Sequence, residues 1–158
     1  MPSDVAVGLG RVVVGVDPSR NAARAAEIVA RFAVIVGVDV VLVHGRGLLE
    51  ARTAGVPDWL GELAAGVRAV IDGSPAGLRT RITTQVVEGA PAEALLRMAA
   101  EPGTSAVVVG RTGAGSAVQR ALGSTSAEVV ARCPVPVVVI PEESPPPPPT
   151  RVVPASSG

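Results

Sequence analysis

The sequence predicts an α/β fold in which a parallel sheet is covered by helices on both faces. Five short apolar runs alternate with segments of helical periodicity, an alternation typical of this architecture. Apolar residues make up 47% of the 158 residues, yet only Phe32 and Trp59 are aromatic. The core is therefore expected to consist of Val, Leu, Ile and Ala, as in strands buried on both sides. The length suits one domain.

The predicted strands are the most apolar short segments of the chain. In the third predicted strand about half of the alternating positions are polar, so we expect this strand at an edge of the sheet. The residue pattern by itself leaves the strand order open. The five segments are Arg11 to Val16, Val38 to His44, Thr80 to Val87, Ser105 to Val109 and Val135 to Ile140.

Four helices are predicted between these strands. Ser19 is expected to cap the first helix and Asp58 the second, because short polar side chains accept hydrogen bonds from the first turn. Pro91 suits the first turn of the third helix. The fourth helix runs from about Thr125 to Arg132 and is stopped by Pro134.

Residues Glu142 to Gly158, EESPPPPPTRVVPASSG, differ in composition from the rest of the chain. Five consecutive prolines favour an extended polyproline helix, and the other residues offer little apolar surface for a core. We predict one folded domain over residues 1–141 and a Pro-rich disordered tail over residues 142–158.

Composition narrows the classes of function. The formal net charge is zero and all fourteen cations are Arg. The sequence has no basic stripe, so nucleic acid and acidic membranes are not expected as partners. Without Lys, Schiff-base chemistry and a Walker A loop are excluded. The single Cys133 indicates a reduced cytoplasmic setting. The N-terminus does not resemble a signal peptide, and the apolar stretch from Phe32 to Val38 is far shorter than the roughly 18 residues of a membrane span.

A glycine-rich segment follows the fourth predicted strand. Two residues separate Gly110 from Gly113, and nine more separate Gly113 from Gly123, which precedes Ser124 and Thr125 at the start of a helix. Ligands of open parallel sheets bind outside the carboxyl ends of the strands. Helix N-termini present unpaired N–H groups that favour phosphate. The segment therefore indicates a phosphate site, although glycine-rich loops of this kind are also often simple turns.

Several stretches together resemble the universal stress protein family. The spacing of Gly110, Gly113 and Gly123-Ser124 is similar to that family's ATP-binding signature. The stretches VVVGVDPS, VLVHG, VVEGAPAEALL and CPVPVVVIP are similar to its first, second, third and last strands with their flanking residues. The resemblance implies a doubly wound five-stranded parallel sheet in the order 3-2-1-4-5, with the switch point between the first and fourth strands.

The resemblance also implies where ATP, with or without Mg²⁺, would bind. Adenine would lie against Gly15, Val16, Asp17 and the backbone around Gly45. Ribose would lie near Gly110, and the phosphates on Gly113, Gly123, Ser124 and Thr125. Arg111 and Arg120 are candidates for neutralising phosphate charge. The implied nucleotide-binding residues are Gly15, Val16, Asp17, Gly45, Gly110, Arg111, Gly113, Gly123, Ser124 and Thr125. Independently, Gly15 interrupts a β-branched strand, as expected where another group approaches the backbone closely.

Each of these side chains also has a simpler interpretation. Asp17 fits the start of the first helix, Ser124 or Thr125 fits an N-cap, and Arg111 fits a solvated surface residue. His44 is the sole imidazole, which makes a metal site or a catalytic triad a poor fit. We interpret it as structural or site-lining. Trp59 is expected to cover the core and Cys133 to fill a small apolar space.

The resulting expectation is an ATP-binding regulator or sensor of the stress response, with no catalytic and no metal-ligating residue assigned. The alternatives are a different adenine nucleotide such as a cyclic nucleotide, slow ATP hydrolysis, a nucleotide-activating enzyme, and an interaction module with an empty pocket. Protein partners are not specified by the sequence. A homodimer is also expected, because Val135 to Ile140 would form an apolar edge strand that needs a cover. A loop or the tail would serve the same purpose in a monomer.

Overall fold

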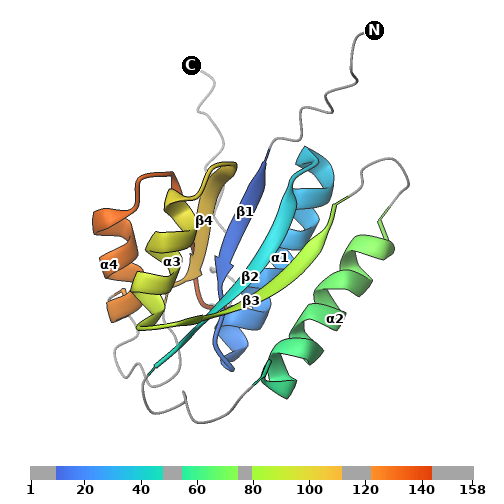
Figure 1. The fold of residues 1–158 in the computed structure, drawn as a ribbon. Helices are drawn as coiled ribbons and strands as arrows, with labels where there is room; N and C mark the ends of the chain where they lie inside the picture. Colours follow the sequence, from blue (N-terminus) through green and yellow to red (C-terminus); the bar gives the residue numbers. More distant parts are fainter. Residues whose placement is uncertain (1–9, 48–54, 75–79, 112–121, 144–158) are drawn as a thin grey trace, which may run out of the picture.

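The computed structural model describes residues 10–47, 55–74, 80–111 and 122–143 (Figure 1). Within these ranges the chain forms five strands and four helices in alternation, ending with a helix and a strand. The elements are β1 (Arg11–Gly15), α1 (Arg20–Val36), β2 (Asp39–Arg46), α2 (Asp58–Asp72), β3 (Ile82–Glu88), α3 (Pro91–Ala100), β4 (Thr104–Gly110), α4 (Ser124–Arg132) and β5 (Val137–Ile140).

The strands form one parallel sheet in the order β3-β2-β1-β4-β5. The predicted fold and the order implied by the family resemblance are both confirmed, and β3 lies at an edge as its polar alternation indicates. Since β1 pairs with both β2 and β4, the direction of winding reverses at β1. The carboxyl ends of β1 and β4 therefore border the switch point, where open sheets bind ligands.

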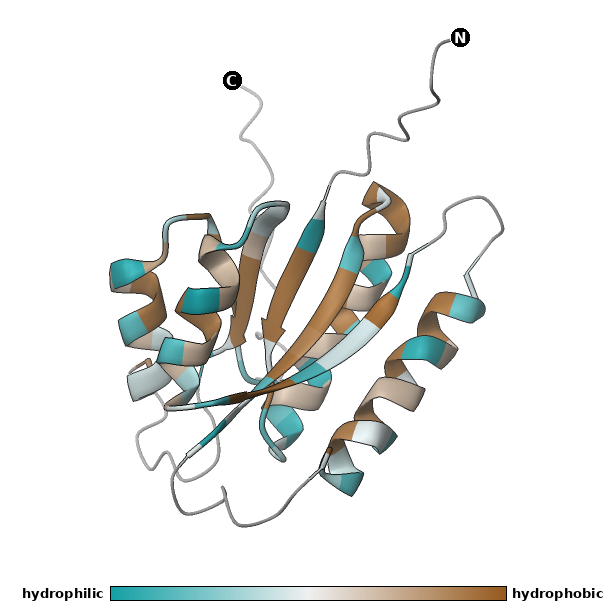
Figure 2. Cartoon of the chain, in the orientation of Figure 1, coloured by the Kyte–Doolittle hydropathy of each residue, from teal (hydrophilic) through white to brown (hydrophobic). Residues whose placement is uncertain are grey.

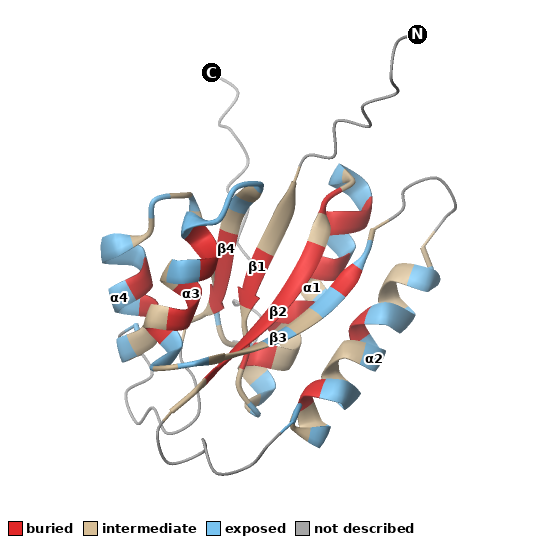
Figure 3. Cartoon of the chain, viewed as in Figure 1, coloured by how far each residue is buried: buried red, intermediate tan, exposed pale blue. Residues whose placement is uncertain are grey.

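Helices cover both faces of the sheet. Side chains of a strand alternate between faces, and here even-numbered strand residues such as Val14 and Leu42 pack with α1 and α2, whereas odd-numbered ones such as Val13 and Val107 pack with α3 and α4. The central strands are apolar along most of their length (Figure 2) and buried (Figure 3). As predicted, Trp59 packs on the core between the sheet and helices α1 and α2. The partly buried Cys133 packs on the core between the sheet and helices α3 and α4.

The helix starts agree with the predictions in two places and differ in two. Ser19 caps α1 through a bond from the Ala22 N–H to its Oγ (3.2 Å), and Pro91 opens α3. Asp58 does not cap α2, because the extended residue before the helix is Pro57 and Asp58 already lies in the first turn. Similarly, the cap residue of α4 is Gly123.

The strands end one or two residues from their expected bounds, and two of the differences have a visible cause or consequence. Strand β2 continues to Arg46, where its pairing with β3 ends. Strand β5 begins only at Val137, because Pro136 has no N–H for the ladder, although its carbonyl still accepts a bond from the Val107 N–H (2.9 Å). Val138 on this edge strand is 46% exposed.

The end of the described chain contacts α1. Arg24 Nη1 donates to the Pro141 carbonyl (2.6 Å), and Asn21 Nδ2 donates to Glu142 Oε1 (3.2 Å). Glu142, which the composition assigns to the tail, thus touches the domain; residues 144–158 lie outside the described part. No helix in the described ranges is long and apolar enough to cross a membrane.

Candidate nucleotide-binding site

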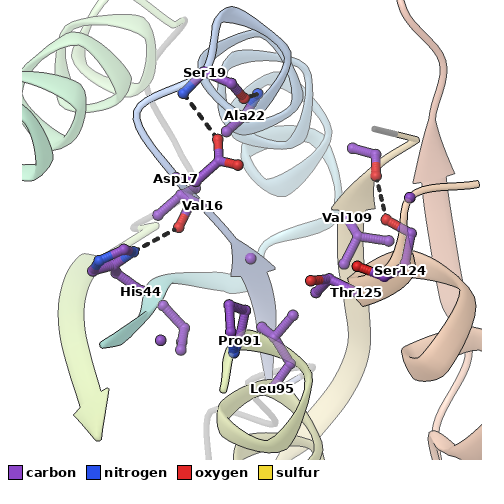
Figure 4. A pocket seen from close by; sticks show the side chains of 16 residues that line it. Val16, Asp17, Ser19, Ala22, His44, Pro91, Leu95, Val109, Ser124 and Thr125 are labelled. Carbon is purple, nitrogen blue, oxygen red and sulfur yellow. Dashed lines mark hydrogen bonds between the residues drawn. The ribbon is translucent and has the colours of Figure 1, made fainter. Parts of the chain in front are cut away.

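A cavity of about 360 Å³ opens at the carboxyl ends of the central strands, within the range of about 300–1,000 Å³ usual for small-molecule sites. In Figure 4, Val16, Asp17 and His44 lie on one side, and Val109, Ser124 and Thr125 lie on the other. The described residues that line the cavity are Gly15, Val16, Asp17, Ser19, Ala22, Val43, His44, Gly45, Pro91, Leu95, Val109, Gly110, Gly123, Ser124, Thr125 and Ser126.

The β1–β2 wall is held by a series of hydrogen bonds (Figure 4). Just past the end of β1, the Val16 N–H donates to the Val43 carbonyl (2.9 Å), and His44 Nδ1 donates to the Val16 carbonyl (3.2 Å). Asp17 Oδ1 then accepts from the Ser19 N–H (2.9 Å). Asp17 thereby also supports the start of α1, the simpler role considered for it, while its carboxylate lines the cavity.

Two glycines of this wall make room for protein atoms. A Cβ on Gly45 would lie 2.5 Å from the Pro91 Cα, so the N-terminus of α3 needs a glycine there. A Cβ on Gly15 would lie 2.7 Å from Leu95 Cδ1. The close approach that we inferred at Gly15 is therefore real, but the approaching group is a leucine side chain packed from α3.

The opposite wall is the N-terminus of α4. Helix geometry leaves the N–H groups of Ser124, Thr125 and Ser126 without a partner inside the helix, and all three residues line the cavity. The first turn of α4 carries no acidic residue, so no carboxylate offsets the partial positive charge of the helix end. This wall therefore favours an anion.

The ends of the glycine segment are tied to each other. The Gly123 N–H donates to the Arg111 carbonyl (2.8 Å), and the Arg111 N–H donates to the Ile140 carbonyl (2.8 Å). The Gly123 N–H is thus already used and does not face a phosphate as a donor. Ser126 Oγ donates to the Gly110 carbonyl (2.6 Å), which joins the first turn of α4 to the end of β4.

Asp17 is the only charged side chain among the described residues that line the cavity. Its carboxylate lies on the β1–β2 wall, away from the N-terminus of α4 (Figure 4). The described residues contain no group of three or more His, Cys, Asp or Glu side chains placed to hold a metal ion. One acceptor on one wall and backbone donors on the other suit recognition of a polar, anionic molecule.

Most of the predicted site residues line one cavity, and two do not. Arg111 is described but lies outside the lining; its Nη2 atom is buried, and no described residue accepts a hydrogen bond from it. Gly113 lies outside the described residues. The predicted residues that line the cavity are Gly15, Val16, Asp17, Gly45, Gly110, Gly123, Ser124 and Thr125.

Sequence reasoning missed several lining residues. Ser19 and Ser126 were accessible from the sequence, since both sit in or beside the first turn of helices that start at the ligand edge of the sheet. Pro91 and Leu95 reach the cavity from α3, and only the close approach of α3 to the glycines of β1 and β2 reveals this. His44 lines the cavity, which is one of the two roles that the sequence suggested for it.

Comparison with known protein families identifies the family of this chain. The universal stress protein family matches residues 8–141. The chain belongs to the universal stress protein family. The match extends from just before β1 to just past β5 and includes both walls of the cavity. Among curated proteins, no sequence matches the chain.

Solved universal stress proteins share the fold. One that was crystallised in complex with cAMP is 25% identical, with a TM-score of 0.62, over 84% of this chain and 96% of that one. One from Archaeoglobus fulgidus DSM 4304 is 27% identical (TM-score 0.61) over 85% of this chain, which spans only 44% of that protein. Another from Archaeoglobus fulgidus, solved in complex with dAMP, is 23% identical (TM-score 0.57) over 82% and 96%.

Proposed function

We propose that this universal stress protein binds an adenine nucleotide in the cavity, with the base against Val16 and Asp17 and the phosphate at the N-terminus of α4. The observation that carries the proposal is the pairing of the two walls: open N–H groups without a nearby carboxylate on one side, and a carboxylate acceptor on the other. The complex of the 25% identical relative with cAMP supports the ligand class.

ATP is the ligand we favour, because the spacing of Gly110, Gly113 and Gly123-Ser124 resembles the family's ATP-binding signature. A cyclic nucleotide is the second candidate, supported by the cAMP complex of the relative. Titration calorimetry with ATP, cAMP and adenosine separates them. Micromolar affinity for ATP with at least tenfold weaker binding of cAMP supports ATP; the reverse order assigns a cyclic nucleotide, and no heat with any of the three refutes the proposal.

We infer a regulatory or sensor role in the stress response, exerted in the cytoplasm through protein partners. Phosphoryl transfer relies on fixed groups that position the nucleophile and neutralise charge, and among the described lining residues Asp17 is the only carboxylate, with no Lys or Arg beside it. Binding therefore fits the cavity better than turnover. Phosphate release from ATP measured over hours tests this: many turnovers per minute, lost in Asp17→Asn, would make the protein an enzyme.

We further propose a homodimer in which the β5 strands of two copies pair antiparallel. Strand β5 is a sheet edge with the apolar Val138 46% exposed, a combination that invites edge pairing. Sedimentation equilibrium at tens of micromolar protein is expected to give the dimer mass. Val138→Asp should shift it towards the monomer, whereas Val130→Asp, at an equally exposed valine on α4 (47%), should not. A monomer mass for the parent protein rules the dimer out.

A further inference from the structure

Two polar side chains are buried in the described part of the molecule, His44 (6% exposed) and Ser126 (4% exposed). Both line the cavity, one from each wall. Both also make the same kind of contact, a hydrogen bond from the side chain to a backbone carbonyl. His44 Nδ1 donates to the carbonyl of Val16 (3.2 Å), and Ser126 Oγ donates to that of Gly110 (2.6 Å).

The two carbonyls lie where the pairing between β1 and β4 stops. The last paired residues of these strands are Val14 and Val108, two positions before Val16 and Gly110. Beyond them the strands no longer bond to each other, and the cavity opens between their ends. A carbonyl at the end of a strand that has no ladder partner needs another donor. His44 supplies it on one side of the opening and Ser126 on the other.

Each donor is itself fixed. The rings of His44 and Trp59 make a T-shaped contact, with an interplanar angle of 89° and ring centroids 4.9 Å apart. Trp59 on α2 thereby restrains the orientation of the imidazole. Ser126 belongs to the first turn of α4, so its bond to Gly110 also sets how far the N–H groups of that turn stand from the end of β4. Each wall is thus contacted by one buried side chain that the proposed binding mode does not otherwise use.

We propose that His44 and Ser126 are a pair of positioning residues that set the width of the nucleotide cavity. His44 holds the base wall at Val16, and Ser126 holds the phosphate wall at Gly110. This inference rests on the function proposed above because it concerns the same cavity. It differs from a general stabilising role in that the geometry of the donor, and not merely a filled volume, decides ligand affinity.

Matched variants separate the two roles. In His44→Asn the amide nitrogen takes the place of Nδ1, whereas in His44→Gln it takes the place of Nε2, and His44→Leu has no donor. Ser126→Thr keeps a hydroxyl, and Ser126→Ala removes it. Affinity for ATP and cAMP is measured by calorimetry on the full chain, and stability by thermal unfolding. We expect His44→Asn and Ser126→Thr to bind within about threefold of the parent, and the other three variants to lose about tenfold, the size of one hydrogen bond to a buried acceptor.

Amide hydrogen exchange of the ligand-free protein provides a second measurement that does not depend on the nucleotide. His44→Leu should speed exchange at the Ser19 N–H, which is bonded to Asp17 next to Val16, and leave the Gly123 N–H unchanged. Ser126→Ala should do the opposite, because the Gly123 N–H is bonded next to Gly110, at Arg111. The donor-keeping variants should leave both amides protected.

The outcomes are distinct. If affinity follows the thermal midpoint in all five variants, with Asn and Thr no better than Leu and Ala, the residues act only through stability and the inference is wrong. If exchange speeds up throughout the domain in every variant, the inference is also wrong. If the parent binds none of the ligands, the proposed function fails, whereas wall-specific changes in exchange would still assign His44 and Ser126 to their walls.

Discussion

The β1–β2 wall and the α4 wall of the cavity are built by different means. On the β1–β2 wall, strand pairing continues up to Gly15, and a side chain from the neighbouring strand holds the next residue. On the α4 wall, the chain leaves β4 at Gly110 and returns at Gly123, and the ligand-facing groups are backbone N–H groups of a helix start. The first wall has a fixed shape, and the second has a favourable charge.

This difference predicts a division of labour. A wall of fixed shape with one carboxylate acceptor distinguishes one base from another. A helix N-terminus attracts any phosphate, whatever base is attached to it. The β1–β2 wall should therefore determine selectivity for adenine, and the α4 wall should determine how much affinity the phosphates add. Substitutions on one wall or the other test this division.

The substitution with the largest expected effect is at Gly45, where an added side chain would distort the β1–β2 wall. In Gly45→Ala the new Cβ would lie 2.5 Å from the Pro91 Cα, a backbone atom that cannot rotate away. We expect a loss of about 3 kcal/mol of unfolding free energy, the upper range for overpacking. Chemical denaturation measures it. Gly47→Ala is the control, because nothing lies within 4 Å of its new Cβ; equal stability of the two variants would contradict the assignment.

Gly123→Val should remove the contribution of the α4 wall. A branched side chain at this position blocks the approach of phosphate to the N–H groups of Ser124 and Thr125. We expect the affinity for ATP to fall about 100-fold, or about 2.7 kcal/mol, while the affinity for adenosine stays within about threefold. Gly61→Val, at an open position on α2, is the matched control. A parent-like affinity for ATP in Gly123→Val would mean that the phosphates lie elsewhere.

Asp17→Asn should act on the β1–β2 wall and affect both ligands equally. The amide oxygen can still accept from the Ser19 N–H, so the fold is kept, but the charged acceptor for the base or ribose is lost. Affinity for adenosine and for ATP should fall by the same factor, about tenfold, since hydrogen bonds to charged groups contribute about 1.5–3 kcal/mol. Asp58→Asn, in the first turn of α2, is the control. A loss for ATP alone would move Asp17 to the phosphate side.

The smallest effect is expected outside both walls, at the C-terminus. Removal of residues 144–158 should change the unfolding free energy by less than about 1 kcal/mol and leave ATP binding intact, because the composition of the tail offers little apolar surface to bury. Removal of residues 142–158 should cost slightly more, since Glu142 accepts from Asn21. Thermal unfolding of the two truncations gives the comparison; a larger loss in the first would show that the tail packs on the domain.

The sequence predicted the helices, the strands and eight of the sixteen described residues that line the cavity, because these features have local signals. Ser19 precedes a periodic apolar stripe, and Pro91 marks a helix start. The pair formed by His44 and Ser126 had no such signal. Their acceptors, Val16 and Gly110, lie 28 and 16 residues away along the chain, so the pairing exists only after the sheet has formed.

The glycines show where residue type alone is ambiguous. Gly15 indicates a close approach, but only the packing of Leu95 identifies what approaches. Gly123 lies at a turn before a helix, yet its φ of −60° is open to any residue. Backbone strain therefore does not explain a loss of binding in Gly123→Val. A glycine in a sequence can indicate that space is needed, but it does not identify the group that occupies this space.

The bond between the Gly123 N–H and the Arg111 carbonyl has a consequence for how this protein can diversify. It closes the chain at both ends of residues 112–122, so the sheet and α4 are held in place independently of the residues in between. Doubling the length of a closed loop costs only about 0.6 kcal/mol in chain entropy. Changes in the length of the chain between Arg111 and Gly123, by recombination or by design, should therefore be tolerated while the sheet and α4 are inherited unchanged.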